Sequence, residues 1–217
     1  MSLDRREALE RIRSARLYAI TPEADPERIE SLVTAWLRGG VEVVQLRLKQ
    51  LPRGQLAALA SRLAPVCAAA GVPFIVDDHL DVALLSGAAG VHVGPDDLSV
   101  AAVRRVSGEL VVGASAATPE AAREAVRQGA DYLGSGPAYA TPIKTEKAVI
   151  GPAGVAAVAA AVAVPVFAIG GVERSRLAEL RAMGVRRVCA IRALSEVADP
   201  EAEARAWRRV LDEPTVG

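Results

Sequence analysis

Three polar side chains alternate along one short hydrophobic segment of the sequence. Gln45, Arg47 and Lys49 stand at every second position of Val43–Lys49, with Val or Leu between them. A β-strand would therefore place the polar side chains on one face and the hydrocarbon side chains on the other. In a closed parallel barrel covered by helices, the apolar face packs outward and the polar face points inward. Two neighbouring cations there predict an anionic ligand, although a strand at a wet sheet edge would show the same pattern.

Carboxylates gather after the next two β-rich segments. Asp77 and Asp78 follow a hydrophobic run, and Asp96 and Asp97 follow the segment that contains His92. These carboxylates would lie at adjacent strand ends and would repel one another unless a divalent cation lay between them. Mg²⁺ suits such oxygen ligands, and the two nearby cations would hold the remaining oxygens of a diphosphate. The structural alternative is a helix cap at Asp77 and turn residues at Asp96 or Asp97.

A second anion site is predicted near the end of the chain. Gly170 and Gly171 follow the seventh β-rich segment, and Ile191 and Arg192 follow the eighth. In barrels of parallel strands, phosphate commonly binds backbone N–H groups at this corner. A Gly-Gly pair after a strand is also what an ordinary turn requires. Two anion sites in one mouth imply a substrate with two charged ends or two substrates that are joined there.

Further polar side chains fall between the two predicted anion sites. Ser115, Thr141 and Lys144 offer hydroxyl and ammonium groups that could orient a heterocycle and a leaving diphosphate. A solvated loop is the alternative for them. His79 could be either a surface residue or a ligand, and we interpret His92 as a hydrogen-bonded core residue.

The elements that must position these residues are short strands that alternate with helices. Such alternation predicts repeated βα units and a parallel sheet. The eight expected strands are Leu17–Thr21, Val43–Lys49, Phe74–Asp78, Gly90–Val93, Val111–Ala114, Tyr132–Ser135, Val166–Ile169 and Arg187–Ile191. We therefore predict an α/β fold that is a single (β/α)8 TIM barrel over residues 1–217, with residues 1–14 forming an extra N-terminal helix. A doubly wound open sheet would share most of this pattern.

Composition limits the class of partner. The 217 residues carry 26 Lys and Arg against 26 Asp and Glu, and no basic run suggests a nucleic-acid surface. Two cysteines indicate neither a disulfide framework nor a zinc site. No apolar run approaches the ~18 residues of a membrane span. We expect a cytoplasmic protein with small-molecule substrates and no nucleic-acid or membrane partner; a homo-oligomer is compatible with the sequence. There is no P-loop and no HExxH motif.

Taken together, the motifs resemble those of the thiamine phosphate synthase/TenI superfamily. The resemblance runs from Leu17 to about Leu211 and is carried by QLRLK at 45–49, VDD at 76–78, GVHVGPDD at 90–97, GAS at 113–115, DYLGSGP at 131–137 and AIGG at 168–171. It implies a (β/α)8 enzyme that joins hydroxymethylpyrimidine diphosphate to hydroxyethylthiazole phosphate. The products would be thiamine phosphate and diphosphate. In that family the diphosphate leaves first, and the thiazole nitrogen captures the resulting cation.

The resemblance also implies a role for individual residues. Gln45, Arg47 and Lys49 would hold the diphosphate, and Asp78 and Asp97 would bind Mg²⁺. The remaining positions match substrate contacts of the family. These contacts are Asp77, Ser115, Thr141 and Lys144 on the diphosphate substrate or its heterocycle, and Gly171, Ile191 and Arg192 at the thiazole phosphate. Of all the residues implied, those expected to be catalytic are Arg47, Lys49, Ser115 and Lys144.

Three positions depart from the family pattern. Asp77 replaces an asparagine and adds a negative charge beside the diphosphate, Ile143 replaces the second threonine of a Thr-x-Thr-Lys loop, and Arg192 replaces a serine. Two alternatives therefore stay open. One is a TenI-like thiazole tautomerase, whose histidine two residues after the serine is Ala117 here. The other is a non-catalytic paralogue that binds phosphate ligands.

Overall fold

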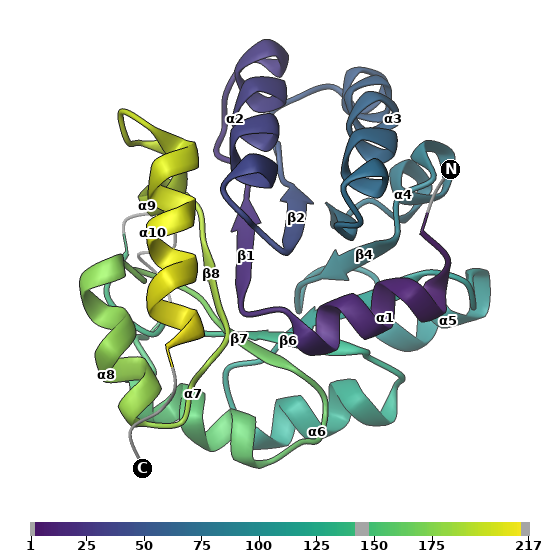
Figure 1. Ribbon diagram of the computed structural model, residues 1–217. Coiled ribbons are helices and arrows are strands. Elements are labelled where there is room, and N and C mark those ends of the chain that lie inside the picture. Colours follow the sequence, from purple (N-terminus) through teal and green to yellow (C-terminus); the bar gives the residue numbers. More distant parts are fainter. Residues whose placement is uncertain (1–2, 142–147, 214–217) are drawn as a thin grey trace.

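The computed structural model describes residues 3–141 and 148–213, which form a closed barrel of eight parallel strands (Figure 1). Each strand pairs with its sequence neighbours, and β1 closes the barrel on β8 with Leu17 opposite Val188. The strands are β1 (Leu17–Ile20), β2 (Val43–Leu46), β3 (Phe74–Asp77), β4 (Gly90–Val93), β5 (Val111–Ser115), β6 (Tyr132–Ser135), β7 (Val166–Ala168) and β8 (Val188–Ala190). The predicted TIM barrel is confirmed, and the open-sheet alternative is wrong.

Helices follow the strands and form the outer layer. They are α2 (Pro26–Arg38), α3 (Arg53–Ala69), α4 (Leu80–Ser86), α5 (Val100–Val106), α6 (Pro119–Arg127), α7 (Gly151–Ala160), η2 (Arg174–Arg176), α8 (Leu177–Ala182), α9 (Arg192–Ser195) and α10 (Pro200–Asp212). An additional helix, α1 (Arg5–Ser14), precedes β1. Its buried Ala8 and Ile12 pack with the side chains of the barrel interior. Within the described ranges, no helix combines the length and the apolar character needed to cross a bilayer.

The hydrophobic core has two parts because inward and outward side chains alternate along each strand. The larger cluster lies between strands and helices and contains Val44, Leu46 and Leu48. The smaller cluster fills the barrel interior and contains Tyr18, Tyr132 and Phe167 among others. The predicted outward packing of the hydrocarbon face of β2 is therefore confirmed. The sheet-edge alternative is wrong, because β2 pairs with both β1 and β3.

One predicted strand boundary is wrong in a way that matters for the site. β2 ends at Leu46 rather than Lys49. Beyond that point, side chains of the loop after β1 accept hydrogen bonds from the backbone N–H groups that follow β2. Arg47 N–H donates to Thr21 Oγ1 over 2.8 Å, and Lys49 N–H donates to Glu23 Oε1 over 2.8 Å. The chain therefore leaves the sheet after Leu46, and both cations line the cavity just beyond the end of β2.

Candidate active site

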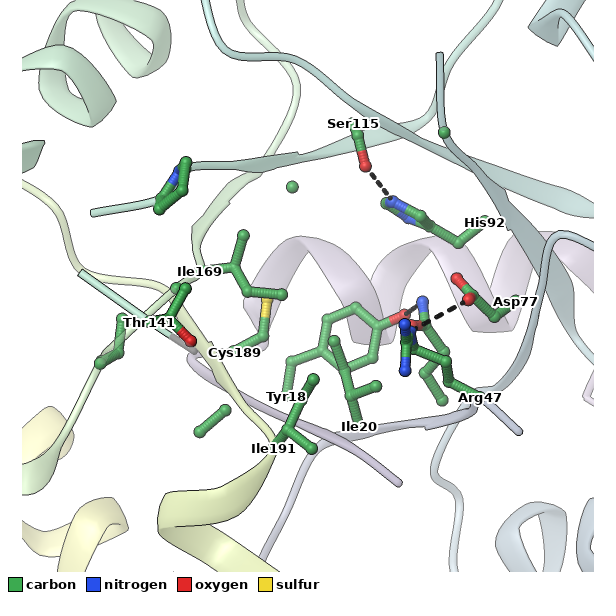
Figure 2. Close-up of a pocket in the computed structure, with 18 of the residues that line it drawn as sticks. Tyr18, Ile20, Arg47, Asp77, His92, Ser115, Thr141, Ile169, Cys189 and Ile191 are labelled. Atoms are coloured by element: carbon green, nitrogen blue, oxygen red, sulfur yellow. Dashed lines mark hydrogen bonds and ion pairs between the residues drawn. The ribbon is translucent and has the colours of Figure 1, made fainter. Parts of the chain in front are cut away.

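A cavity of about 1010 Å³ opens at the carboxyl ends of the strands. The predicted site residues that line it are Gln45, Arg47, Lys49, Asp77, Asp78, Asp97, Ser115, Thr141, Gly171, Ile191 and Arg192. Figure 2 shows Arg47 and Asp77 on one side of the cavity and Thr141, Ile169 and Ile191 on the other. Lys144 and Ile143 lie outside the described residues.

The first side of the cavity is built around Arg47. Its Nε lies 3.6 Å from Asp77 Oδ2, and its Nη1 lies 3.7 Å from Glu23 Oε1. The Arg47 side chain is only 18% exposed, and both carboxylates therefore lie near a largely enclosed guanidinium. These separations exceed the usual charge-assisted hydrogen-bond length of about 2.7–2.9 Å. The helix-cap alternative for Asp77 is wrong, because His79 occupies the N-cap position of α4.

Lys49, Asp78 and Asp97 form a second charged group beside Arg47. Lys49 Nζ lies 2.9 Å from Asp78 Oδ2, and this hydrogen bond raises the pKa of the Lys49 ammonium. Asp78 has a left-handed backbone with φ of 60°. Asp97 Oδ2 accepts the Gly94 N–H over 2.8 Å, so the turn interpretation of Asp97 is also correct.

The two carboxyl groups of Asp78 and Asp97 interact with each other. Burial raises the pKa of Asp97, and the neighbouring Asp78 raises it further. Burial also opposes ionisation of Asp78, but hydrogen bonds with Lys49 and Asp97 outweigh it and lower the Asp78 pKa. Two adjacent carboxyls that compete for ionisation are a donor set that fits Mg²⁺. Residues 3–141 and 148–213 contain no group of three or more His, Cys, Asp or Glu side chains that could hold a metal ion. Mg²⁺ commonly completes such a site with substrate oxygens and water.

A row of polar side chains crosses the floor of the cavity. Gln45 Nε2 donates to Tyr18 Oη over 2.8 Å, and Tyr18 Oη lies 3.0 Å from Tyr132 Oη. Tyr132 Oη lies 3.2 Å from His92 Nδ1. His92 Nε2 lies 3.1 Å from Ser115 Oγ, as Figure 2 shows. His92 is hydrogen-bonded as predicted, but it also lines the cavity. Sequence reasoning missed His92, Tyr18 and Tyr132 as site residues, although strand alternation alone would point His92 inward with Gly90.

The far side of the cavity is a glycine corner. Gly170 and Gly171 have φ of 91° and 61°. A Cβ on Gly171 would lie 2.6 Å from Ala140 O and 2.9 Å from Tyr139 Cβ, so the loop after β7 can approach the loop after β6 only with glycine here. Arg192 stands next to this corner with its side chain 44% exposed, and its Nη1 lies 3.9 Å from Glu196 Oε2.

Comparison with known proteins gives matches over most of the chain. The family model described as thiamine monophosphate synthase matches residues 17–194. The chain is 41% identical over 198 residues to a thiamine-phosphate synthase of Gloeobacter violaceus, covering 91% of this chain and 57% of that protein. It is 40% identical over 199 residues to a thiamine-phosphate synthase of Roseiflexus sp. strain RS-1, covering 90% of this chain and 84% of that protein.

A solved structure agrees with these sequence matches. Thiamine phosphate pyrophosphorylase from Pyrococcus furiosus superposes with a TM-score of 0.84 at 30% sequence identity, covering 94% of this chain and 98% of that one. The resemblance drawn from the motifs is thus confirmed over the whole barrel. The chain belongs to the thiamine monophosphate synthase family.

Proposed function

We propose that the cavity binds hydroxymethylpyrimidine diphosphate and hydroxyethylthiazole phosphate and joins them to thiamine phosphate, with release of diphosphate. The observation that carries this proposal is the meeting of cations and carboxylates at one rim: Lys49 Nζ lies 2.9 Å from Asp78, and Arg47 Nε lies 3.6 Å from Asp77. Thiamine-phosphate synthase activity in relatives that share about 40% of this sequence supports the same function.

The diphosphate end of the first substrate lies against the charged rim in this proposal. Arg47 presents a planar fork of donors to two phosphate oxygens, and Lys49 adds a point charge. Asp78 and Asp97 are the residues that would hold Mg²⁺. The chemistry that a bound Mg²⁺ supplies there is neutralisation of charge on the diphosphate. Gln45 lies deeper and is 2% exposed, at the junction between the rim and the cavity floor.

The reaction needs no nucleophile from the protein. The bond between the pyrimidine methylene carbon and the diphosphate oxygen breaks, and the electron pair leaves with the diphosphate. The lone pair of the thiazole nitrogen then forms the new carbon–nitrogen bond, and the positive charge moves to the thiazolium ring. The protein contributes by stabilising the departing negative charge at Arg47 and Lys49 and by orienting the second substrate.

The phosphate of the second substrate lies at the glycine corner in this proposal. Gly171, Ile191 and Arg192 all line the cavity, and in this proposal their backbone N–H groups bind the phosphate while the Arg192 side chain adds a cation. Ser115 and Thr141 also line the cavity and are proposed to contact the substrates there. The Arg192 guanidinium would exchange its 3.9 Å contact with Glu196 for the phosphate.

Turnover of the two substrates tests the proposal. We expect thiamine phosphate and diphosphate to form in equal amounts when the purified protein is mixed with both substrates and Mg²⁺, and to stop forming when EDTA is added. Isomerisation of the thiazole without metal would instead indicate a tautomerase, although Ala117 lines the cavity where a tautomerase has histidine. Binding of both substrates without product would indicate a non-catalytic binder. Either result would overturn the proposal.

A further inference from the structure

The hydrogen-bonded row on the cavity floor joins two proposed substrate contacts. Gln45 stands at one end and Ser115 at the other, with Tyr18, Tyr132 and His92 between them. Each of the four contacts lies between 2.8 and 3.2 Å. The three inner side chains come from β1, β6 and β4, which are distant in sequence and meet only inside the barrel. Such a row can act as a unit because each of its three inner members can accept from one neighbour and donate to the other.

Glycines stand at two strand positions that face the side chains of this row. Gly113 lies opposite Tyr132 in the β5–β6 register, and a Cβ there would lie 2.1 Å from Tyr132 Cζ. A Cβ on Gly134 would lie 3.4 Å from His92 Cε1. Tyr132 also packs edge-on against Phe167 at a centroid distance of 6.0 Å. The Tyr132 ring therefore requires glycine at position 113, while the His92 ring lies at van der Waals distance from position 134.

Counting donors and acceptors along the row gives it one direction. The Gln45 amide nitrogen can only donate, so Tyr18 Oη accepts from it. The single Tyr18 proton is then directed to Tyr132, and the Tyr132 proton is directed to His92 Nδ1. In the opposite direction Tyr18 would accept twice, and its own proton, in a side chain that is 1% exposed, would have no acceptor in the row. Burial raises the pKa of both phenols, so both keep their protons near neutral pH.

We propose that this row holds His92 as the neutral Nε2–H tautomer and so makes Ser115 a hydrogen-bond donor to the pyrimidine diphosphate. His92 Nε2–H donates to Ser115 Oγ, which leaves the Ser115 proton for an acceptor atom of the substrate in the cavity. Tyr132 is then a positioning residue that acts through His92 and Ser115. The direction of the row is argued from the structure alone, and only the identity of the ligand rests on the proposed function.

The tautomer can be measured without any turnover. The chain has only two histidines, His79 and His92, so ¹H–¹⁵N correlation spectra of the imidazoles can be assigned by comparison with a His79→Gln variant. At about pH 8 an ordinary imidazole is neutral. We expect His92 to carry its proton on Nε2, with a lone pair on Nδ1, and we expect this preference to weaken in Tyr132→Phe. A proton on Nδ1 in the unmodified protein would overturn the proposal.

Kinetics test whether Tyr132 acts through Ser115. Tyr132→Phe removes one hydroxyl and keeps the ring, and we expect kcat/KM for the pyrimidine diphosphate to fall about tenfold. The double variant Ser115→Ala/Tyr132→Phe should be no slower than Ser115→Ala alone. Effects that multiply would mean that Tyr132 has only a structural role and would overturn the proposal. The matched control is Tyr139→Phe, because that hydroxyl donates to Glu179 on the exposed side of its loop and should leave kcat/KM unchanged.

The outcomes separate this inference from the proposed function. If the unmodified protein makes no thiamine phosphate, the proposed function fails while the ¹⁵N measurement still decides the direction of the row. If Tyr132→Phe does not fold, the unmodified protein alone decides the tautomer. Tyr18→Phe then replaces it in the kinetic comparison, breaking the row one residue earlier.

Discussion

Carboxylates and arginines meet at both ends of the barrel, but they are bonded differently at the two ends. At the amino ends of the strands, Asp131 accepts hydrogen bonds from Arg5 Nη2 over 2.7 Å and from the Val112 N–H over 2.9 Å. It also pairs with Arg104. The Arg104 guanidinium donates further hydrogen bonds to the carbonyl oxygens of Leu110 and Gly129. Every partner of this carboxylate is a fixed part of the fold.

Glu42 repeats this arrangement at the same end. Its Oε2 accepts the Arg16 N–H over 2.7 Å and the Leu17 N–H over 3.0 Å, and it pairs with Arg208 of α10. The carboxylate thereby ties the start of β1 to the loop before β2 and to the last helix.

At the mouth, the charges of Arg47 are held more loosely. Its contacts to Asp77 and Glu23 are 3.6 Å and 3.7 Å long. A guanidinium at such distances keeps much of its hydrogen-bonding capacity for an incoming phosphate. The comparison teaches that residue type alone does not separate a structural ion pair from a binding site. The number and length of the hydrogen bonds around Asp131 and around Arg47 do separate them, so Asp131→Ala should destabilise the protein and Arg47→Ala should lower its activity.

The largest expected effect is at Asp78. We expect Asp78→Asn to lower kcat by roughly 10²–10³-fold, a typical loss when charge stabilisation is removed from a transition state. Asparagine is chosen because it tolerates the positive φ of 60° better than alanine. Steady-state rates across a Mg²⁺ titration measure the effect, and thermal unfolding checks the fold. A rate near that of the unmodified enzyme would remove Asp78 from the proposed metal site.

At the opposite end, Asp131→Ala should cost stability and leave the chemistry intact. Removing this carboxylate leaves Arg5 and Arg104 without their shared partner, and we expect a loss of about 2–3 kcal/mol after allowing for partial exposure of both arginines. For a chain of this size, Tm should fall by about 2–4 °C for each kcal/mol. Calorimetry measures the shift, and kcat per folded molecule should not change. A lower kcat with unchanged Tm would contradict the comparison.

Arg47→Ala should weaken the mouth without weakening the fold. We expect kcat/KM for the pyrimidine diphosphate to fall by roughly 10–100-fold, because the planar donor fork for the diphosphate is lost. Arg47→Lys should recover only part of this loss, because it restores the charge without the fork. Arg53→Ala is a matched control, since Arg53 is a nearby cation whose side chain is 59% exposed and pairs with Asp81. Equal losses of kcat/KM in Arg47→Ala and Arg53→Ala would mean that the overall positive charge of this region matters, rather than direct binding of the diphosphate by Arg47.

The barrel and most of its mouth could be predicted from the sequence because local patterns encode them. Period-two hydrophobicity and repeated βα alternation predict the strands, and the polar residues at strand ends follow from the barrel geometry. The end of β2 could not be predicted. It depends on Thr21 and Glu23, whose side chains take backbone donors in place of the next strand.

The hydrogen-bonded row on the cavity floor could not be predicted from the sequence either. Tyr18 and Tyr132 are separated by 114 residues, and His92 and Tyr132 by 40. Only the register of β1, β4 and β6 brings these side chains together, and a lone tyrosine or histidine in a strand has the same sequence signature as an ordinary core residue. Arg5 and Arg104 at Asp131 likewise give no signal, since arginines are frequent throughout this chain.

The smallest expected effect concerns Asp77, the carboxylate for which the motif resemblance implies an asparagine in the family. Asp77→Asn removes a negative charge beside the proposed diphosphate position and releases Arg47 from a contact of 3.6 Å. Like charges so close oppose binding, so we expect KM for the pyrimidine diphosphate to fall about threefold to tenfold, and less at high salt. Glu23→Gln removes the carboxylate on the other side of Arg47 and should act in the same direction more weakly, because Glu23 is 42% exposed. A rise in KM together with a higher Mg²⁺ requirement in Asp77→Asn would make Asp77 a metal ligand, and the mouth would then hold three metal-binding carboxylates rather than two.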